Sequence, residues 1–247
     1  MMRTQLLISV RNSQEALTAL SAGADIIDLK DPAVGALGAL SVATMQAIAL
    51  TIKASSTATP SVTISATVGE NHLSINHLIE VTMQTASLGI DVIKIALNTK
   101  LIGGLLADTD FLNATNMLRK QHKKLIGVMF AEQAIDFNTL CKVKNLGFDG
   151  LMLDTAEKNG QNLLDYQSLE DLATFVQFCT KNHLICGLAG SLSQDLVEKL
   201  SHLNPNYVGL RGGVCCDLNR QAELDSNKII EIKNMLLKHH KLSDKAH

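Results

Sequence analysis

The segment AGADIIDLK (22–30) decides the fold, because three later segments repeat its pattern. The other copies are LGIDVIKIA (88–96), LGFDGLMLD (146–154) and NPNYVGLRG (204–212). Each copy opens with residues that commonly end a helix, passes a polar or aromatic residue, and continues as a short apolar run. Such runs are typical of buried strands. The repeat therefore predicts four strands, each following a helix.

Strand-like runs alternate with segments of helical periodicity along the whole chain. We expect strands in 5–10, 25–31, 61–69, 92–97, 124–131, 150–155, 184–190 and 207–213. Eight strand–helix units in 247 residues predict an α/β fold, a single-domain (β/α)8 (TIM) barrel over residues 1–247. The alternative is an open doubly wound sheet, but no unit carries a glycine-rich dinucleotide fingerprint.

The helical segments carry their own signals. Asn12 and Glu15 have the spacing of a capping box at the start of the first helix. We expect a single helix after the fourth strand, over 108–122, and a single helix after the sixth strand, over 168–183. No low-complexity linker separates the units.

Charged residues interrupt the apolar runs at matching positions of the repeat. The copies are aligned on Asp25, Asp91, Asp149 and Asn206. Three residues after these positions stand Asp28, Lys94, Met152 and Gly209, respectively. Five residues after them stand Lys30, Ala96, Asp154 and Arg211. Side chains two residues apart on a strand share a face, and alternate strands of an eight-stranded barrel fill the same interior layer. We therefore expect these charges to converge at the carboxyl ends of the strands, where barrel active sites lie.

Lysines and carboxylates at such a place indicate Schiff-base chemistry on a carbonyl compound. Burial and a second nearby ammonium lower the pKa of a lysine and make it nucleophilic, while a carboxylate transfers protons. The candidate residues are Asp28, Lys30, Lys94 and Asp154. The simpler alternative for Asp28 and Lys30 is an ion pair at a strand end. Lys158, in the loop after the sixth strand, is either a solvated lysine or part of a loop that closes over substrate.

Two glycine-rich segments, GLAGSL (187–192) and GLRGG (209–213), end the last two strands. Barrels often bind phosphate there, because glycine lets backbone N–H groups approach an anion. We expect a phosphate site formed by Gly190, Ser191, Arg211, Gly212 and Gly213. Arg211 has a second interpretation, as an ion-pair partner of Asp28 or Asp154.

Composition excludes several other functions. A net charge of −2 gives no basic field for a nucleic acid or an acidic membrane, and no stretch is long and apolar enough to span a bilayer. Five cysteines without framework spacing are typical of reduced thiols, so we expect a cytoplasmic protein. No His, Cys, Asp and Glu cluster has metal-ligand spacing, and we expect neither metal nor cofactor. The sequence leaves a homo-oligomer open.

Five segments together resemble the (5-formylfuran-3-yl)methyl phosphate synthase family over essentially the whole chain. They are 23–40, 89–97, 150–166, 187–192 and 208–215. The resemblance implies a (β/α)8 lyase that condenses two molecules of glyceraldehyde 3-phosphate to a phosphorylated furan aldehyde, with loss of phosphate and water. The product is the furan precursor of methanofuran and methylofuran-type one-carbon carriers. Lys30 would form the Schiff base, and Asp28, Lys94, Asp154 and Lys158 would share the proton transfers.

Three other functions remain as alternatives. A decarboxylase or isomerase of the ribulose-phosphate-binding barrels shares the Asp-x-Lys pattern, but its orotidine-phosphate-decarboxylase-type branch has a further Asp where this chain has Ala33. Another Schiff-base aldolase would release an open-chain sugar phosphate. A phosphometabolite sensor would bind without turnover.

Overall fold

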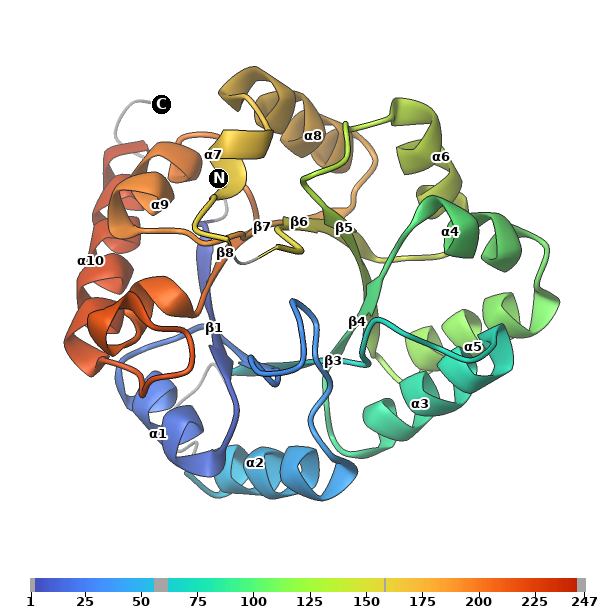
Figure 1. Ribbon diagram of the computed structural model, residues 1–247, viewed down its shortest axis with the longest axis horizontal. Helices are drawn as coiled ribbons and strands as arrows, with labels where there is room; N and C mark the ends of the chain where they lie inside the picture. Colours follow the sequence, from blue (N-terminus) through green and yellow to red (C-terminus); the bar gives the residue numbers. More distant parts are fainter. Residues whose placement is uncertain (1–2, 56–61, 158, 244–247) are drawn as a thin grey trace.

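The computed structural model describes residues 3–55, 62–157 and 159–243, and within them the strands close into one barrel. All neighbouring strands are parallel and follow the order of the chain, so β1 closes the ring against β8 (Figure 1). The strands are β1 (Gln5–Val10), β2 (Ile26–Leu29), β3 (Thr63–Thr67), β4 (Val92–Ala96), β5 (Lys124–Phe130), β6 (Gly150–Asp154), β7 (Ile185–Leu188) and β8 (Tyr207–Leu210). The predicted closed barrel is confirmed, and the open sheet is excluded.

Helices surround the barrel on the outside (Figure 1). They are α1 (Ser13–Ser21), α2 (Val42–Ser55), α3 (Ile75–Ser87), α4 (Thr99–Leu106), α5 (Thr109–Lys120), α6 (Phe137–Asn145), α7 (Leu163–Tyr166), α8 (Leu169–Lys181), α9 (Gln194–Ser201) and α10 (Ser226–Ser243), with short 3-10 turns η1 (Gly212–Val214) and η2 (Cys216–Leu218). No helix of the described ranges is both long and apolar enough to cross a membrane.

Two of the predicted single helices are in fact pairs. After β4 the chain forms α4 before α5, although Gly103 and Gly104 disfavour a helix. Asn98 caps α4 by accepting the N–H of Leu101 at 2.8 Å, and Ile102 is buried against the core, which offsets the glycines. After β6 the four-residue α7 precedes α8.

Alternation along each strand separates two hydrophobic cores. Ile27 and Leu29 of β2 point outward into the large core between strands and helices. Ile26 points inward, into a smaller cluster with Met152 and Tyr207 that fills the barrel interior. The inward position after Ile26 is Asp28, so the alternation of β2 carries a carboxylate into the barrel. The predicted register is therefore confirmed.

The repeat has a structural cause at the first residue of each copy. The side chains of Asp25, Asp91, Asp149 and Asn206 accept the backbone N–H of Leu6, Ile64, Leu125 and Cys186, respectively, at 2.7–3.0 Å. The same four residues donate their own backbone N–H groups to the carbonyl oxygens of those partners. Each even-numbered strand is thus tied to the strand before it by an identical pair of hydrogen bonds, which fixes the register of the barrel in four places.

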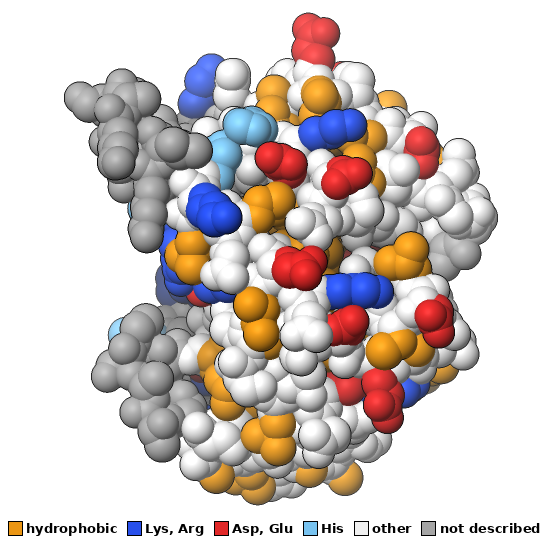
Figure 2. Space-filling view, turned by 90° about the vertical axis from the view of Figure 1, so that its left-hand side faces the viewer, with side chains coloured by type: hydrophobic (Ala, Val, Ile, Leu, Met, Phe, Trp, Pro, Cys, Tyr) orange, Lys and Arg blue, Asp and Glu red, His pale blue; other side chains and the backbone are white. Residues whose placement is uncertain are grey.

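One outer face is formed by α9, α10 and α1. On it, acidic and basic side chains are interspersed with isolated hydrophobic ones (Figure 2). This face therefore carries no field of a single sign.

Candidate active site

Four charged side chains meet inside the carboxyl end of the barrel. Asp28 of β2 and Lys94 of β4 lie in one layer, while Lys30, just beyond β2, and Asp154, at the end of β6, lie nearer the mouth. All four are at least 93% buried, because their relative exposures are 0%, 1%, 7% and 3%, respectively. The sequence-predicted convergence of these side chains is what the structure shows.

Asp28 and Lys94 form the deeper pair. The Nζ atom of Lys94 lies 2.7 Å from Oδ2 of Asp28. The two carboxylate oxygens of Asp28 also accept hydrogen bonds from the hydroxyls of Ser65, at 2.6 Å, and Ser9, at 3.0 Å. These hydroxyls sit on the neighbouring strands, directly opposite Asp28 in register. The buried carboxylate is therefore held by one cation and two donors.

Burial and a carboxylate act in opposite directions on the amine of Lys94. No acceptor in the described part of the chain makes a well-aligned hydrogen bond with Nζ, despite its contact with Asp28. Burial lowers the pKa of Lys94 below its ordinary value; Asp28 opposes this shift, and the neighbouring Lys30 adds to it. Lys94 is therefore suited to release and accept protons.

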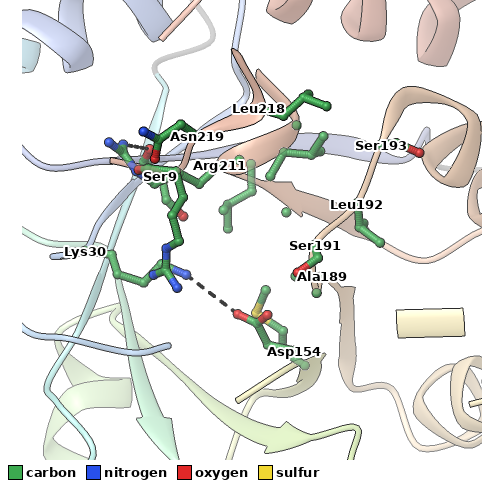
Figure 3. A pocket seen from close by; sticks show the side chains of 18 of the residues that line it. Ser9, Lys30, Asp154, Ala189, Ser191, Leu192, Ser193, Arg211, Leu218 and Asn219 are labelled. Atoms are coloured by element: carbon green, nitrogen blue, oxygen red, sulfur yellow. Dashed lines mark hydrogen bonds and ion pairs between the residues drawn. The ribbon is translucent and has the colours of Figure 1, made fainter. Parts of the chain in front are cut away.

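Lys30 and Asp154 form the upper pair. The Nζ atom of Lys30 lies 3.6 Å from Oδ2 of Asp154, and the two side chains point toward one another across the mouth (Figure 3). Oδ1 of Asp154 accepts the backbone N–H of Thr155 at 2.8 Å. Lys158, the fifth predicted catalytic residue, lies outside the described residues.

A cavity of about 530 Å³ opens above these pairs. Its wall includes Lys30, Lys94 and Asp154, together with residues 189–193 and 209–213. A volume in this range is typical of small-molecule sites. Both lysines reach the cavity, but Lys30 lies one layer closer to its opening.

The two glycine-rich segments lie where the sequence places them, on the cavity wall. Gly190 has φ 117°, and a Cβ there would lie 2.8 Å from Cγ2 of Thr155, so only glycine fits. The backbone N–H groups of Ser191 and Leu192 find no acceptor among the residues described. Gly212 and Gly213 begin η1, so their N–H groups have no intrahelical acceptor. These N–H groups can receive an anion.

Arg211 differs from both predicted roles, because its partner is Glu15 of α1. The two side chains form a buried bidentate ion pair, at 2.7 and 3.0 Å. The other N–H groups of the guanidinium donate to the carbonyl oxygens of Ser9 at 2.9 Å and Arg220 at 2.7 Å, with the Ala222 oxygen at 3.5 Å. All five donors are thus occupied, so Arg211 pairs with neither Asp28 nor Asp154 and has no donor left for a phosphate.

Of the two hydrogen bonds of the predicted capping box, only the one accepted by Asn12 forms. Asn12 accepts the backbone N–H of Glu15 at 2.8 Å and caps α1. The Glu15 carboxylate instead accepts the N–H of Arg11 at 3.0 Å and pairs with Arg211.

Sequence reasoning missed Ser9, Ser65 and Arg220 as well as Glu15. Ser9 and Ser65 lie on inward positions of strands adjacent to β2, and a polar residue inside an apolar run was the available signal. Arg220 lines the cavity from the segment 214–227, which has no strand or helix pattern to place it.

The fold and the site place the chain among the (β/α)8-barrel enzymes. Solved structures with the same fold include phosphoribosyl anthranilate isomerase of Thermus thermophilus, with TM-score 0.64, 14% identity and coverage of 95% of this chain and 99% of that one. KGPDC of Streptococcus mutans gives TM-score 0.65 and 14% identity, over 95% and 98%. Such low identities show the fold alone.

Sequence comparison gives the family. The family model described as 4-HFC-P synthase matches residues 6–233, so the chain belongs to the 4-HFC-P synthase family. A candidate (5-formylfuran-3-yl)methyl phosphate synthase of Methylorubrum extorquens is 36% identical over 229 residues, 93% of this chain and 90% of the relative. The (5-formylfuran-3-yl)methyl phosphate synthase of Methanocaldococcus jannaschii is 30% identical over 246 residues, 93% and 98% of the two chains. The relatives are named as synthases, which makes the family one of enzymes.

Proposed function

We propose that the protein is a lyase that condenses two molecules of glyceraldehyde 3-phosphate to (5-formylfuran-3-yl)methyl phosphate through a Schiff base on Lys30. The two triose chains supply all the carbon atoms of the product. One phosphate ester leaves as inorganic phosphate, and the remaining oxygen and hydrogen atoms leave as water. The product would feed a furan-containing carrier of one-carbon units.

The observation that carries the proposal is the position of Lys30. Its amine lines an open cavity, 3.6 Å from the carboxylate of Asp154 and one layer above a second lysine. A carbonyl carbon entering from the mouth meets Lys30 before Lys94, which is 1% exposed and one layer deeper. Imine formation requires an accessible amine and a nearby group that transfers protons, and this pair supplies both.

The chemistry divides between the two pairs. One triose phosphate isomerises to the ketone, and the amine of Lys30 adds to its carbonyl carbon; Asp154 protonates the departing hydroxyl, which leaves as water. The second triose loses its C2 proton and then its phosphate, which gives an enol, and the terminal carbon of that enol attacks the imine carbon of the first triose. Lys94 and Asp28, directly below, take up and return protons during isomerisation and enol formation, as the lowered pKa of Lys94 favours.

The remaining steps release the enzyme. The free hydroxyl of the first triose adds to the ketone of the second and closes the ring, and loss of water and of the Lys30 amine then forms the aromatic furan. The backbone N–H groups of Ser191, Leu192, Gly212 and Gly213 would bind the phosphate that the product retains. Formation of the aromatic ring makes the series of reaction steps favourable.

The test is to incubate the purified chain with glyceraldehyde 3-phosphate and follow both the ultraviolet chromophore of a furan aldehyde and the release of inorganic phosphate. Borohydride added during turnover reduces the imine, and peptide mass spectrometry then locates the labelled lysine. We expect the chromophore, phosphate release and label at Lys30.

Two variants sharpen the assignment. Lys30→Ala should abolish both signals while the protein stays folded, whereas Lys120→Ala, on the exposed surface of α5, should leave them unchanged. Label found only on Lys94 would refute Lys30 as the nucleophile. An open-chain sugar phosphate without chromophore would identify another Schiff-base aldolase, and binding without any turnover would identify a sensor.

A further inference from the structure

Arg220 is a cation at the mouth that forms no ion pair with a carboxylate of the described residues. Its side chain lines the cavity together with Lys30 and Asp154, and it is half-buried. Lys94 is paired with Asp28 and Lys30 with Asp154, so both carboxylates of the site already have a lysine. Throughout the described ranges, no carboxylate forms an ion pair with Arg220. Asp154 and Asp31 act on the Arg220 guanidinium from beyond ion-pair distance, so an anion could still pair with it directly.

Most hydrogen-bond donors of Arg220 are unused. One N–H of Nη2 donates to the carbonyl oxygen of Gly35, at 3.0 Å, in the loop after β2. The structure gives the other four N–H groups no acceptor among its described residues. A half-buried guanidinium with this many open donors is suited to bind an oxyanion in the fork-like geometry that arginine favours.

Neighbouring residues fix the position of Arg220. The Nε atom of Arg211 donates to the carbonyl oxygen of Arg220 at 2.7 Å, and Arg211 is itself fixed by Glu15. The preceding residues Asp217 and Leu218 both have positive φ values, 50° and 56°. A left-handed conformation is unfavourable for leucine, so the surrounding structure imposes this turn. The turn directs Arg220 across the mouth.

Arg220 spans two parts of the cavity wall. A Cβ at Gly212 would lie 3.8 Å from the Cβ of Arg220, so its stem starts beside the glycine-rich segments. The guanidinium ends at Gly35, on the side of the mouth formed by the loop after β2. The cation and the backbone N–H groups of Ser191 and Leu192 thus offer two separate positions for anions in one cavity.

We propose that Arg220 binds the phosphate of the second triose phosphate, the one that loses its phosphate and attacks the imine. The inference rests on the proposed function, because condensing two phosphorylated trioses brings two dianions into one cavity. The glycine-rich segments would hold one, and Arg220 neutralises the other. Arg220 touches substrate without taking part in imine formation on Lys30.

The experiment separates the first substrate from the second. Dihydroxyacetone phosphate alone, with borohydride, measures imine formation with the first triose on Lys30. Furan formation from glyceraldehyde 3-phosphate requires both trioses. For Arg220→Met, which keeps the apolar stem, we expect kcat/KM for furan formation to fall about 10- to 100-fold, the size of a lost charge-assisted hydrogen bond. Trapping at Lys30 should stay within about two-fold of the native chain.

Three further variants complete the design. Arg220→Lys should restore part of the furan activity because it returns the charge without the fork, and Arg220→Gln replaces the methionine variant if that protein fails to fold. Arg119→Met, an exposed arginine of α5, is the matched control. Native-like furan kinetics in Arg220→Met would overturn the inference alone, as would loss of trapping together with furan formation. A native chain that neither traps triose nor forms furan would refute the proposed function and, with it, this inference.

Discussion

The Glu15–Arg211 ion pair predicts a large loss of stability when its carboxylate is neutralised. Both side chains are buried, at 4% and 7% exposure, and the pair is bidentate. Glu15→Gln keeps the shape but places an amide NH2 against one guanidinium nitrogen and leaves the positive charge of Arg211 buried without a counter-ion. Breaking one partner of such a pair costs about 3–5 kcal/mol. Arg11 also faces Glu15, at 3.1 Å, and loses the same carboxylate.

Urea unfolding followed by circular dichroism measures the change as a shift of the midpoint at constant slope. For a chain of this length, about 3 kcal/mol corresponds to a melting temperature lower by roughly 6–12 °C. Glu80→Gln, on the exposed side of α3, removes a carboxylate without burial and should change stability by less than about 0.5 kcal/mol.

The same variant tests the link from this pair to the mouth. Because Arg211 donates to the carbonyl oxygens of Arg220 and Ser9, an unpaired Arg211 loosens residues 216–222. We expect faster amide hydrogen exchange in that segment of Glu15→Gln than in the rest of the barrel. A change in stability below about 0.5 kcal/mol, or unaltered exchange in 216–222, would refute the reasoning.

Three other predictions concern separate parts of the molecule. Lys94 has a lowered pKa, so between that value and its ordinary pKa near 10.4 the unfolded chain binds more protons than the folded one. In this pH range the free energy of unfolding of the native chain, relative to that of Lys94→Met, should rise with pH. A difference that does not change with pH would contradict the lowered pKa. Gly187→Ala puts a Cβ 2.2 Å from Cζ of Tyr207 and should cost about 1–3 kcal/mol in urea unfolding, with partial recovery in a double variant that adds Tyr207→Leu; equal losses in both would exclude the clash. Asn98→Ala removes the cap of α4 and should cost about 1 kcal/mol in thermal melting, whereas an unchanged melting temperature would show that α4 does not depend on it.

The barrel and its inward charges are predictable from sequence because both follow local rules. The alternation of Ile26, Ile27 and Asp28 assigns one face of β2 to the interior, and the repeat transfers that register to β4, β6 and β8. The repeat is visible in the sequence because each copy starts with a polar residue, which in the structure accepts a hydrogen bond from the preceding strand.

The sequence could not predict contacts between residues that lie far apart in the chain, because each of these residues already fits a role in its local segment. Glu15 fits a capping box with Asn12, and nothing nearby indicates that its carboxylate reaches Arg211, 196 residues away. Arg220 lies in a segment without periodicity, so its direction depends on the positive φ values before it and on Arg211. The two glycines within α4 concealed this helix, because capping and burial outweigh helix propensity there.

The four pairs of hydrogen bonds that Asp25, Asp91, Asp149 and Asn206 form with the preceding strand, here called ties, indicate where the chain could be cut and rejoined. Each tie joins residues only 19 to 27 positions apart, within one quarter of the barrel, and none crosses from one quarter to the next. Between quarters, the backbone N–H of Gln5 donates to Asn206 in the same way that Thr63 donates to Asp25. Circular permutants cut near His122 or His183, between quarters, with the two ends of the chain joined by a flexible linker, would keep each tie within one continuous segment. The native termini are then one choice among several that the geometry accepts.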